Sequence, residues 1–103
     1  MTTQINLSID NVISDPKIYA DRIFDQLDVS EGTRVDYKYR ISLFLDFINN
    51  QKLHRNSYLE FKRYLANRND YAVSTKNKYL VTARIFLKEL NRLGLIPVDV
   101  TQN

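Results

Sequence analysis

The sequence contains no cysteine, one histidine, two glycines and two prolines among its 103 residues. The absence of cysteine excludes disulfides, cysteine-ligated zinc and thiol nucleophiles, and a single histidine leaves little for a metal site. No stretch approaches the roughly 18 apolar residues that a membrane-spanning helix needs. The first ten residues also lack the basic and apolar regions of a signal peptide. We therefore expect no metal, no cofactor, no membrane partner and a cytoplasmic protein.

Catalytic motifs are scarce as well. Gly32 and Gly94 stand too far apart to form a glycine-rich loop that cradles phosphates. His54 has no partner at the spacings that zinc hydrolases use, and we interpret it as a solvated loop residue. Asp21 and Asp25 are one helical turn apart, but acids outside a cleft usually form a solvated face. The sequence predicts no catalytic residue and no small-molecule substrate.

The composition favours a single globular all-α domain. Hydrophobic residues make up 44% of the chain and aromatic residues 12%, which supports a packed core and argues against disorder. At this length about 65% of the unfolded chain's surface can be buried. The shortage of glycine and proline leaves few interruptions to helices. We expect a small bundle of four or five helices.

The first two predicted helices cover about residues 16–27 and 33–50. The first follows Asp15, a good N-cap, and has Pro16 at its first helical position. We expect Thr33 to cap the second. Its apolar residues lie on most sides, so it is predicted to be the central helix of the bundle. One apolar face holds Tyr37, Ile41, Phe44, Leu45 and Ile48, and another holds Tyr39, Leu43 and Phe47.

The other two predicted helices lie in the second half of the chain. The third opens with the capping-box pattern S-x-x-E at Ser57 and ends near residues 67–69. The fourth begins after Ser74 or Thr75, and Gly94 is expected to end it. Outside the helices, we expect a flexible arm over residues 1–14, a core domain over 15–97 and the start of a linker over 98–103.

Charge is distributed unevenly along the chain. Residues 1–31 contain six acids and two bases, a net charge of −4, whereas residues 32–103 contain thirteen bases and six acids, a net charge of +7. A basic body favours a polyanionic partner, most often nucleic acid. An ordinary solvated surface stays open as the alternative on charge alone.

Basic and polar residues gather at the starts of the second and fourth predicted helices. A helix N-terminus offers free N–H groups and a partial positive charge, which suit a phosphate. Arginine, lysine and asparagine in the first turns are also side chains that read base edges in a major groove. The candidate DNA-binding residues are Thr33, Arg34, Lys38, Ser74, Thr75, Lys76, Asn77, Lys78, Arg84 and Lys88. The alternative is that these are solvent-facing charges on amphipathic helices.

The order of the motifs resembles a known family. The residues that carry the resemblance are Thr33-Arg34-x-x-Tyr37, Phe44-Leu45-x-Phe47, Phe61-x-x-Tyr64-Leu65, Ser74-Thr75-x-Asn77, Ala83-Arg84-x-Phe86-Leu87 and Gly94-Leu95-Ile96. Over about residues 16–97 this pattern resembles the N-terminal SAM-like core-binding domain of tyrosine recombinases, the phage-integrase family. One departure is that the family often has Asn-Pro after the last helix, where this chain reads Ile96-Pro97-Val98.

The resemblance implies a bundle that forms half of a C-shaped clamp on double-stranded DNA, with the second and fourth helices facing the duplex. In the family a separate C-terminal domain performs catalysis, so the resemblance implies a DNA-binding fragment of a recombinase and not an enzyme in itself. None of the tyrosines is assigned as a nucleophile. Recombinases of the family form tetramers on DNA, whereas we expect the isolated domain to be a monomer.

Two other functions remain open from the sequence. A helical protein-interaction module would use its charged faces only to stay in solution, and its basic residues would scatter around the bundle. A stand-alone helix-turn-helix regulator would have a shorter recognition helix that crosses the preceding helix after a tight turn. For the DNA clamp, the strip formed by Arg34 and Lys38 is expected to lie beside the strip from Lys76 to Arg84.

Overall fold

The described part of the chain consists of helices and their connections. In this computed structural model residues 16–48, 53, 55–96 and 100–101 are described, so the predicted arm over residues 1–14 lies outside the described residues. The helices are α2 (Pro16–Asp25), α3 (Glu31–Ile48), α4 (Ser57–Ala66) and α5 (Val73–Arg92). No strand occurs within these ranges. The predicted all-α fold is confirmed.

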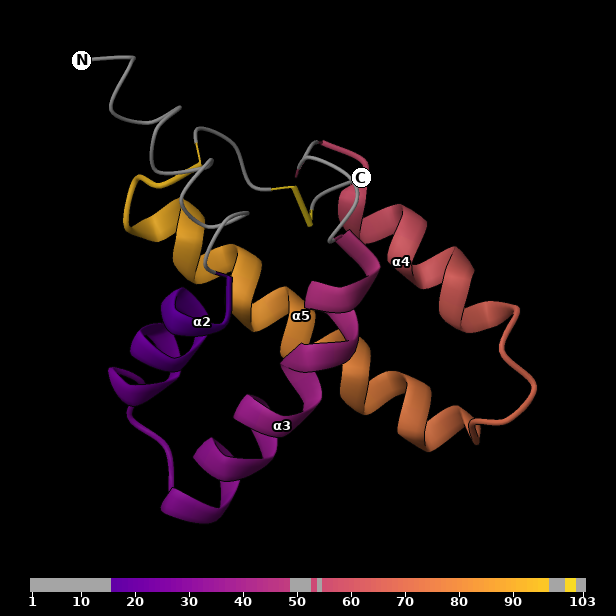
Figure 1. Ribbon diagram of the computed structural model, residues 1–103, viewed down its shortest axis with the longest axis horizontal. Helices are drawn as coiled ribbons and strands as arrows, with labels where there is room; N and C mark the ends of the chain where they lie inside the picture. The colour runs from indigo at the N-terminus through magenta and orange to yellow at the C-terminus, as the bar shows by residue number, and fades with distance from the viewer. Residues whose placement is uncertain (1–15, 49–52, 54, 97–99, 102–103) are drawn as a thin grey trace.

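Two long helices cross and two short helices fill the angles between them. Helices α3 and α5 pack against each other, and both α2 and α4 pack against this crossed pair. Figure 1 shows α2 and α4 on opposite sides of the crossing, with the amino-terminal ends of α3 and α5 both at the lower edge of the view. Helix α3 packs against all three other helices, as predicted for a central helix, but α5 does so as well, so the two long helices share the centre of the bundle.

Each helix contributes one fully buried phenylalanine to the core. Phe24, Phe44, Phe61 and Phe86 come from α2, α3, α4 and α5 in turn, and each is at most 1% exposed. The ring centroids of Phe24 and Phe86 lie 6.3 Å apart, and those of Phe44 and Phe61 lie 5.0 Å apart. Aromatic pairs at such distances stabilise the core beyond the burial of their area. These contacts join α2 to α5 and α3 to α4 through the centre of the molecule.

One predicted apolar face of α3 is partly wrong. Tyr39 is 75% exposed and Val35, one turn earlier, is 57% exposed, whereas Leu43 and Phe47 are half-buried. The three neighbouring helices cover the other sides of α3 and leave this side open. Apolar periodicity alone does not distinguish a helix that is covered on three sides from one that is covered all round.

Two of the four helices start earlier than predicted: α3 begins two residues earlier, and α5 begins at Val73, before the expected Ser74 or Thr75. Helix α3 begins at Glu31, and its cap is Ser30, whose hydroxyl oxygen accepts the N–H of Thr33 at 3.2 Å. The prediction of Thr33 as the cap was therefore wrong. Because Gly32 stands in the first turn, it does not interrupt the helix interior. Helix α4 begins at Ser57 as predicted, but its N-cap position is Asn56, which makes no side-chain capping bond, so the prediction of a capping box with Ser57 as the cap was wrong.

The end of α5 has the geometry that the sequence predicts. Gly94 has a φ of +77°, and its N–H donates to the carbonyl of Asn91 at 3.0 Å. The N–H of Leu95 donates to the carbonyl of Leu90 at 2.9 Å. This pair of hydrogen bonds is the Schellman motif, which favours glycine at the left-handed position. Beyond it Val100 is 4% exposed and packs in the core, so the packed region extends past residue 97.

Candidate nucleic-acid interface

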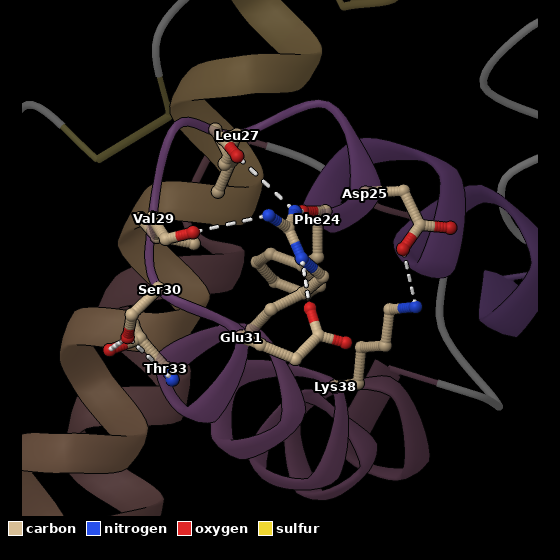
Figure 2. A network of polar contacts seen from close by, with 9 residues as sticks. Phe24, Asp25, Leu27, Val29, Ser30, Glu31, Thr33 and Lys38 are labelled. Carbon is tan, nitrogen blue, oxygen red and sulfur yellow. Dashed lines mark hydrogen bonds and ion pairs between the residues drawn. The ribbon is translucent and has the colours of Figure 1, made fainter.

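Arg34 closes the connection between α2 and α3. Its guanidinium donates to the carbonyl of Phe24, to that of Leu27 at 3.2 Å and to that of Val29 at 3.1 Å. Its Nε donates to a carboxylate oxygen of Glu31 at 2.9 Å, and the side chain is 17% exposed. Figure 2 shows these groups converging on one point at the end of α2. A helix end leaves carbonyl groups without helical partners, and Arg34 provides donors for them.

Lys38 faces the same helix. Its Nζ lies 2.5 Å from a carboxylate oxygen of Asp25, and Figure 2 shows the two side chains pointing toward each other. The hydrogen bond to Asp25 raises the pKa of Lys38 above its ordinary value, despite a smaller opposing effect of burial. Two of the predicted DNA contacts, Arg34 and Lys38, are thus engaged with α2 and its connection to α3. They do not line the hollow described next, so the expectation that these two side chains form a strip beside Lys76 to Arg84 was wrong.

A hollow opens where the first halves of α3 and α5 meet. Its volume is about 320 Å³, and the residues that line it are Thr33, Asp36, Tyr37 and Arg40 from α3 with Asn77, Lys78 and Val81 from α5. The structure therefore brings together three of the predicted site residues, Thr33, Asn77 and Lys78. It adds Arg40, which the sequence analysis missed. The spacing of Thr33, Tyr37 and Arg40, at i, i+4 and i+7, places them on one side of α3 and could have indicated this residue.

The charged groups of the hollow are two cations and one carboxylate. An Nη of Arg40 lies 3.6 Å from a carboxylate oxygen of Asp36, with the two side chains 24% and 59% exposed. Lys78 is exposed, and among the described residues no carboxylate forms an ion pair with its ammonium group. The hollow therefore has a net positive charge and one cation available to an outside anion.

The outer side of α5 continues this surface as a row of exposed residues. The residues of this row are all exposed, and their helical spacing places them on one face of the helix. We call them the α5 stripe: Ser74, Asn77, Lys78, Val81, Arg84 and Lys88. It contains three cations and no acid. From Ser74 to Lys88 it extends about 21 Å at 1.5 Å per residue. Phe86, two positions after Arg84, points to the other side and is fully buried.

Two predicted residues at the start of α5 lie beside the stripe and not on it. Thr75 and Lys76 are half-buried. The Nζ of Lys76 donates to the carbonyl of Ala66 at 3.4 Å, so this ammonium lies over the last turn of α4. The N-cap position, Ala72, has no capping side chain, and the first turn of α5 contains no acidic residue. The first N–H groups of α5 therefore keep their partial positive charge beside the stripe.

A second arginine fixes the start of α5. Arg68, in the α4–α5 connection, donates to Asp70 at 2.7 Å and lies over the ring of Tyr71, 4.3 Å from its centroid. The hydrogen bond from Arg68 lowers the pKa of Asp70 below its ordinary value. The rings of Tyr71 and Tyr79 are 5.4 Å apart, and burial raises the pKa of Tyr79. The connection that precedes the α5 stripe is therefore held in place by ring contacts and by the Arg68–Asp70 ion pair.

Metal binding and membrane insertion find no support in the described ranges. Within residues 16–48, 53, 55–96 and 100–101, no three acidic or histidine side chains gather closely enough to hold a metal ion. None of the described helices is long and apolar enough to span a bilayer.

Comparison of the chain with models of protein families, with curated proteins and with solved structures finds no match.

Proposed function

We propose that this domain binds double-stranded DNA through the α5 stripe and the hollow between α3 and α5. The observation that carries the proposal is the α5 stripe, which presents three cations, an amide and a hydroxyl on one exposed helix face without any acid. A B-DNA major groove is wide enough to admit an α-helix. Phosphate contacts from lysine and arginine supply most of the sequence-independent affinity.

The hollow gives the duplex a second contact beside the stripe. Lys78 belongs to both surfaces, so a backbone that passes Arg84 and Lys78 also reaches Arg40 of α3. Asn77 lies at the same place and has the amide that pairs with adenine. We infer that cations of the stripe and the hollow hold phosphates while Asn77 faces base edges. The expected partner, double-stranded DNA, stays the same. The α3 residues that we propose as its contacts change, because Arg34 and Lys38 are engaged with α2 and its connection to α3.

The wider role that we propose is that of a core-binding domain of the tyrosine recombinase type. Such a domain positions a recombination site for DNA integration or recombination while a separate domain performs the chemistry. The domain itself is then a DNA-binding unit and not a catalyst. Support comes from the motif order along the chain together with the crossing of two long helices whose amino-terminal halves share one surface.

A protein-interaction module is the second candidate, and the open side of α3 favours it. Tyr39 and Val35 are exposed one turn apart, which suits an apolar partner surface. A helix-turn-helix regulator is less well supported. Helix α5 has 20 residues, and the connection over residues 67–72 contains the Arg68 cluster in place of a tight turn.

The test is duplex binding as a function of salt, with charge-matched variants. Four phosphate contacts, from Arg40, Lys78, Arg84 and Lys88, predict that log K falls with log salt with a slope of about −3.6. Arg84→Gln is expected to make the slope shallower by about 0.9. The control Arg22→Gln removes the same charge from an exposed site on α2 and is expected to keep the parent's slope.

Two results would reject the proposal. Absence of duplex binding at low salt would favour the protein-interaction module. Equal losses in the Arg84 and Arg22 variants would show that only net charge matters and that the α5 stripe is not the contact surface.

A further inference from the structure

The hollow between α3 and α5 contains a carboxylate where a phosphate-binding surface would be expected to contain only cations. Asp36 lines it together with Arg40, Asn77 and Lys78. The carboxylate precedes Arg40 by one helical turn and lies 3.6 Å from its guanidinium. An acid four residues before a base is the favoured order for a helical ion pair. The guanidinium of Arg40 therefore has an acidic neighbour within the hollow.

This ion pair is weak enough to be exchanged. The Asp36 side chain is 59% exposed, and exposed pairs at this spacing contribute little to stability because water screens them. A phosphodiester has the same charge as the carboxylate and accepts two parallel hydrogen bonds from a guanidinium. The Arg40 side chain is only 24% exposed, so its position is largely fixed by its surroundings and not by the acid alone. A phosphate that approaches the hollow therefore finds the guanidinium of Arg40 already in position and can replace Asp36 as its partner.

We propose that Asp36 is an internal competitor of the DNA phosphate for Arg40, an inference that rests on the proposed function. In the free protein the carboxylate of Asp36 pairs with the guanidinium of Arg40. In the complex a phosphate of the DNA backbone takes the place of this carboxylate. Asp36 therefore lowers the affinity for every duplex and keeps Arg40 from binding stray anions.

The experiment is a double-mutant cycle on duplex affinity with a control acid. Asp36→Asn removes the charge and keeps the shape, and Asp46→Asn makes the same charge change on the exposed side of α3 outside the hollow. We expect Asp36→Asn to bind about three- to tenfold more tightly than the parent and Asp46→Asn less than twofold, since only the first change removes the carboxylate that competes with the phosphate for Arg40. In an Arg40→Gln background the effect of Asp36→Asn is expected to fall to that of Asp46→Asn.

Three outcomes would overturn the inference. The first is equal gains in the Asp36 and Asp46 variants. The second is a gain that persists without Arg40, which would indicate simple repulsion of the duplex. The third is weaker binding of Asp36→Asn, which would make Asp36 a reader of base amino groups. Unfolding midpoints are measured first so that only folded variants are compared.

A titration with inorganic phosphate separates this inference from the proposed function. The Arg40 Nε signal of the ¹⁵N-labelled protein is expected to shift at lower phosphate concentration in Asp36→Asn than in the parent. If no duplex binds while this difference is present, the DNA proposal fails and the competition at Arg40 holds. If the parent binds duplex and the two phosphate titrations coincide, the competition fails and the DNA proposal holds.

Discussion

Replacing Arg34 by alanine distinguishes a structural arginine from a DNA-binding one. The guanidinium donates to three backbone carbonyls at the end of α2 and in the following connection, those of Phe24, Leu27 and Val29. It also joins Glu31 in the first turn of α3. The change removes the side-chain donor from the oxygens of Leu27 and Val29, whereas that of Phe24 keeps the N–H of Leu27 at 3.3 Å, and it removes the link between the two helices. We therefore expect a loss of stability and not only a loss of binding.

The size of this loss follows from the contacts. A hydrogen bond from a charged donor contributes about 1.5–3 kcal/mol. Three such bonds do not add in full, since water reaches the connection once the guanidinium has gone. We expect Arg34→Ala to lower the free energy of unfolding by about 2–4 kcal/mol. For a domain of this size that lowers the melting temperature by about 8 °C or more.

The assay is thermal and chemical unfolding of Arg34→Ala, Arg34→Lys and the control Arg22→Ala. A single ammonium cannot reproduce the fork of a guanidinium, so Arg34→Lys is expected to recover less than half of the lost stability. Arg22 is exposed on α2, and its replacement is expected to stay within about 0.5 kcal/mol of the parent. A stable Arg34→Ala variant that loses duplex binding would refute the structural role and restore Arg34 as a DNA contact.

Further predictions concern α5 and its two ends. Phe86→Ala is expected to cost about 3–5 kcal/mol in urea unfolding, because the ring is fully buried, and a loss below 1 kcal/mol would contradict this. Arg84→Ala is expected to leave stability within about 0.5 kcal/mol and to weaken only duplex binding; unfolding of this variant would rule out a surface role. Gly94→Ala is expected to cost about 1–2 kcal/mol, because φ is +77° there, and an unchanged unfolding midpoint would argue against the Schellman turn. Arg68 lowers the pKa of Asp70, so the stability from this pair is present above the ordinary aspartate pKa and is lost as the pH falls through the lowered value. The gap in melting temperature between the parent and Asp70→Asn is therefore expected to close at acidic pH, and a gap that is constant with pH would contradict the linkage.

Hydrophobic periodicity was sufficient to predict the all-α bundle. Apolar residues at helical spacing mark the side of a helix that must leave water, and Phe61 and Phe86 lie in the core where this rule places them. Gly94 was predictable for a local reason, since a left-handed residue after a helix favours glycine. Tyr39 was not predictable, because its exposure depends on how many neighbours surround α3.

The candidate site was predictable only in part, because a cation at a helix start has the same local pattern whatever it contacts. Arg34 and Lys78 both follow a helix start by a few residues. Arg34 contacts carbonyl groups in the connection between α2 and α3, whose path depends on the tertiary fold. Lys78 faces outward into the hollow. Arg40 was missed because it lies in the middle of α3, away from any helix start. The packing of α5 against α3 brings it to the interface.

Chemical-shift mapping of the ¹⁵N-labelled domain with a DNA duplex at low salt tests the DNA-binding surface most directly. We predict that shifts concentrate on the α5 stripe and on the side of α3 that lines the hollow, with Asn77, Lys78 and Arg40 among the most affected. The amides of α2 and of the open side of α3 around Tyr39 are expected to change little. Shifts centred on Tyr39, or no shifts on addition of duplex, would contradict the account.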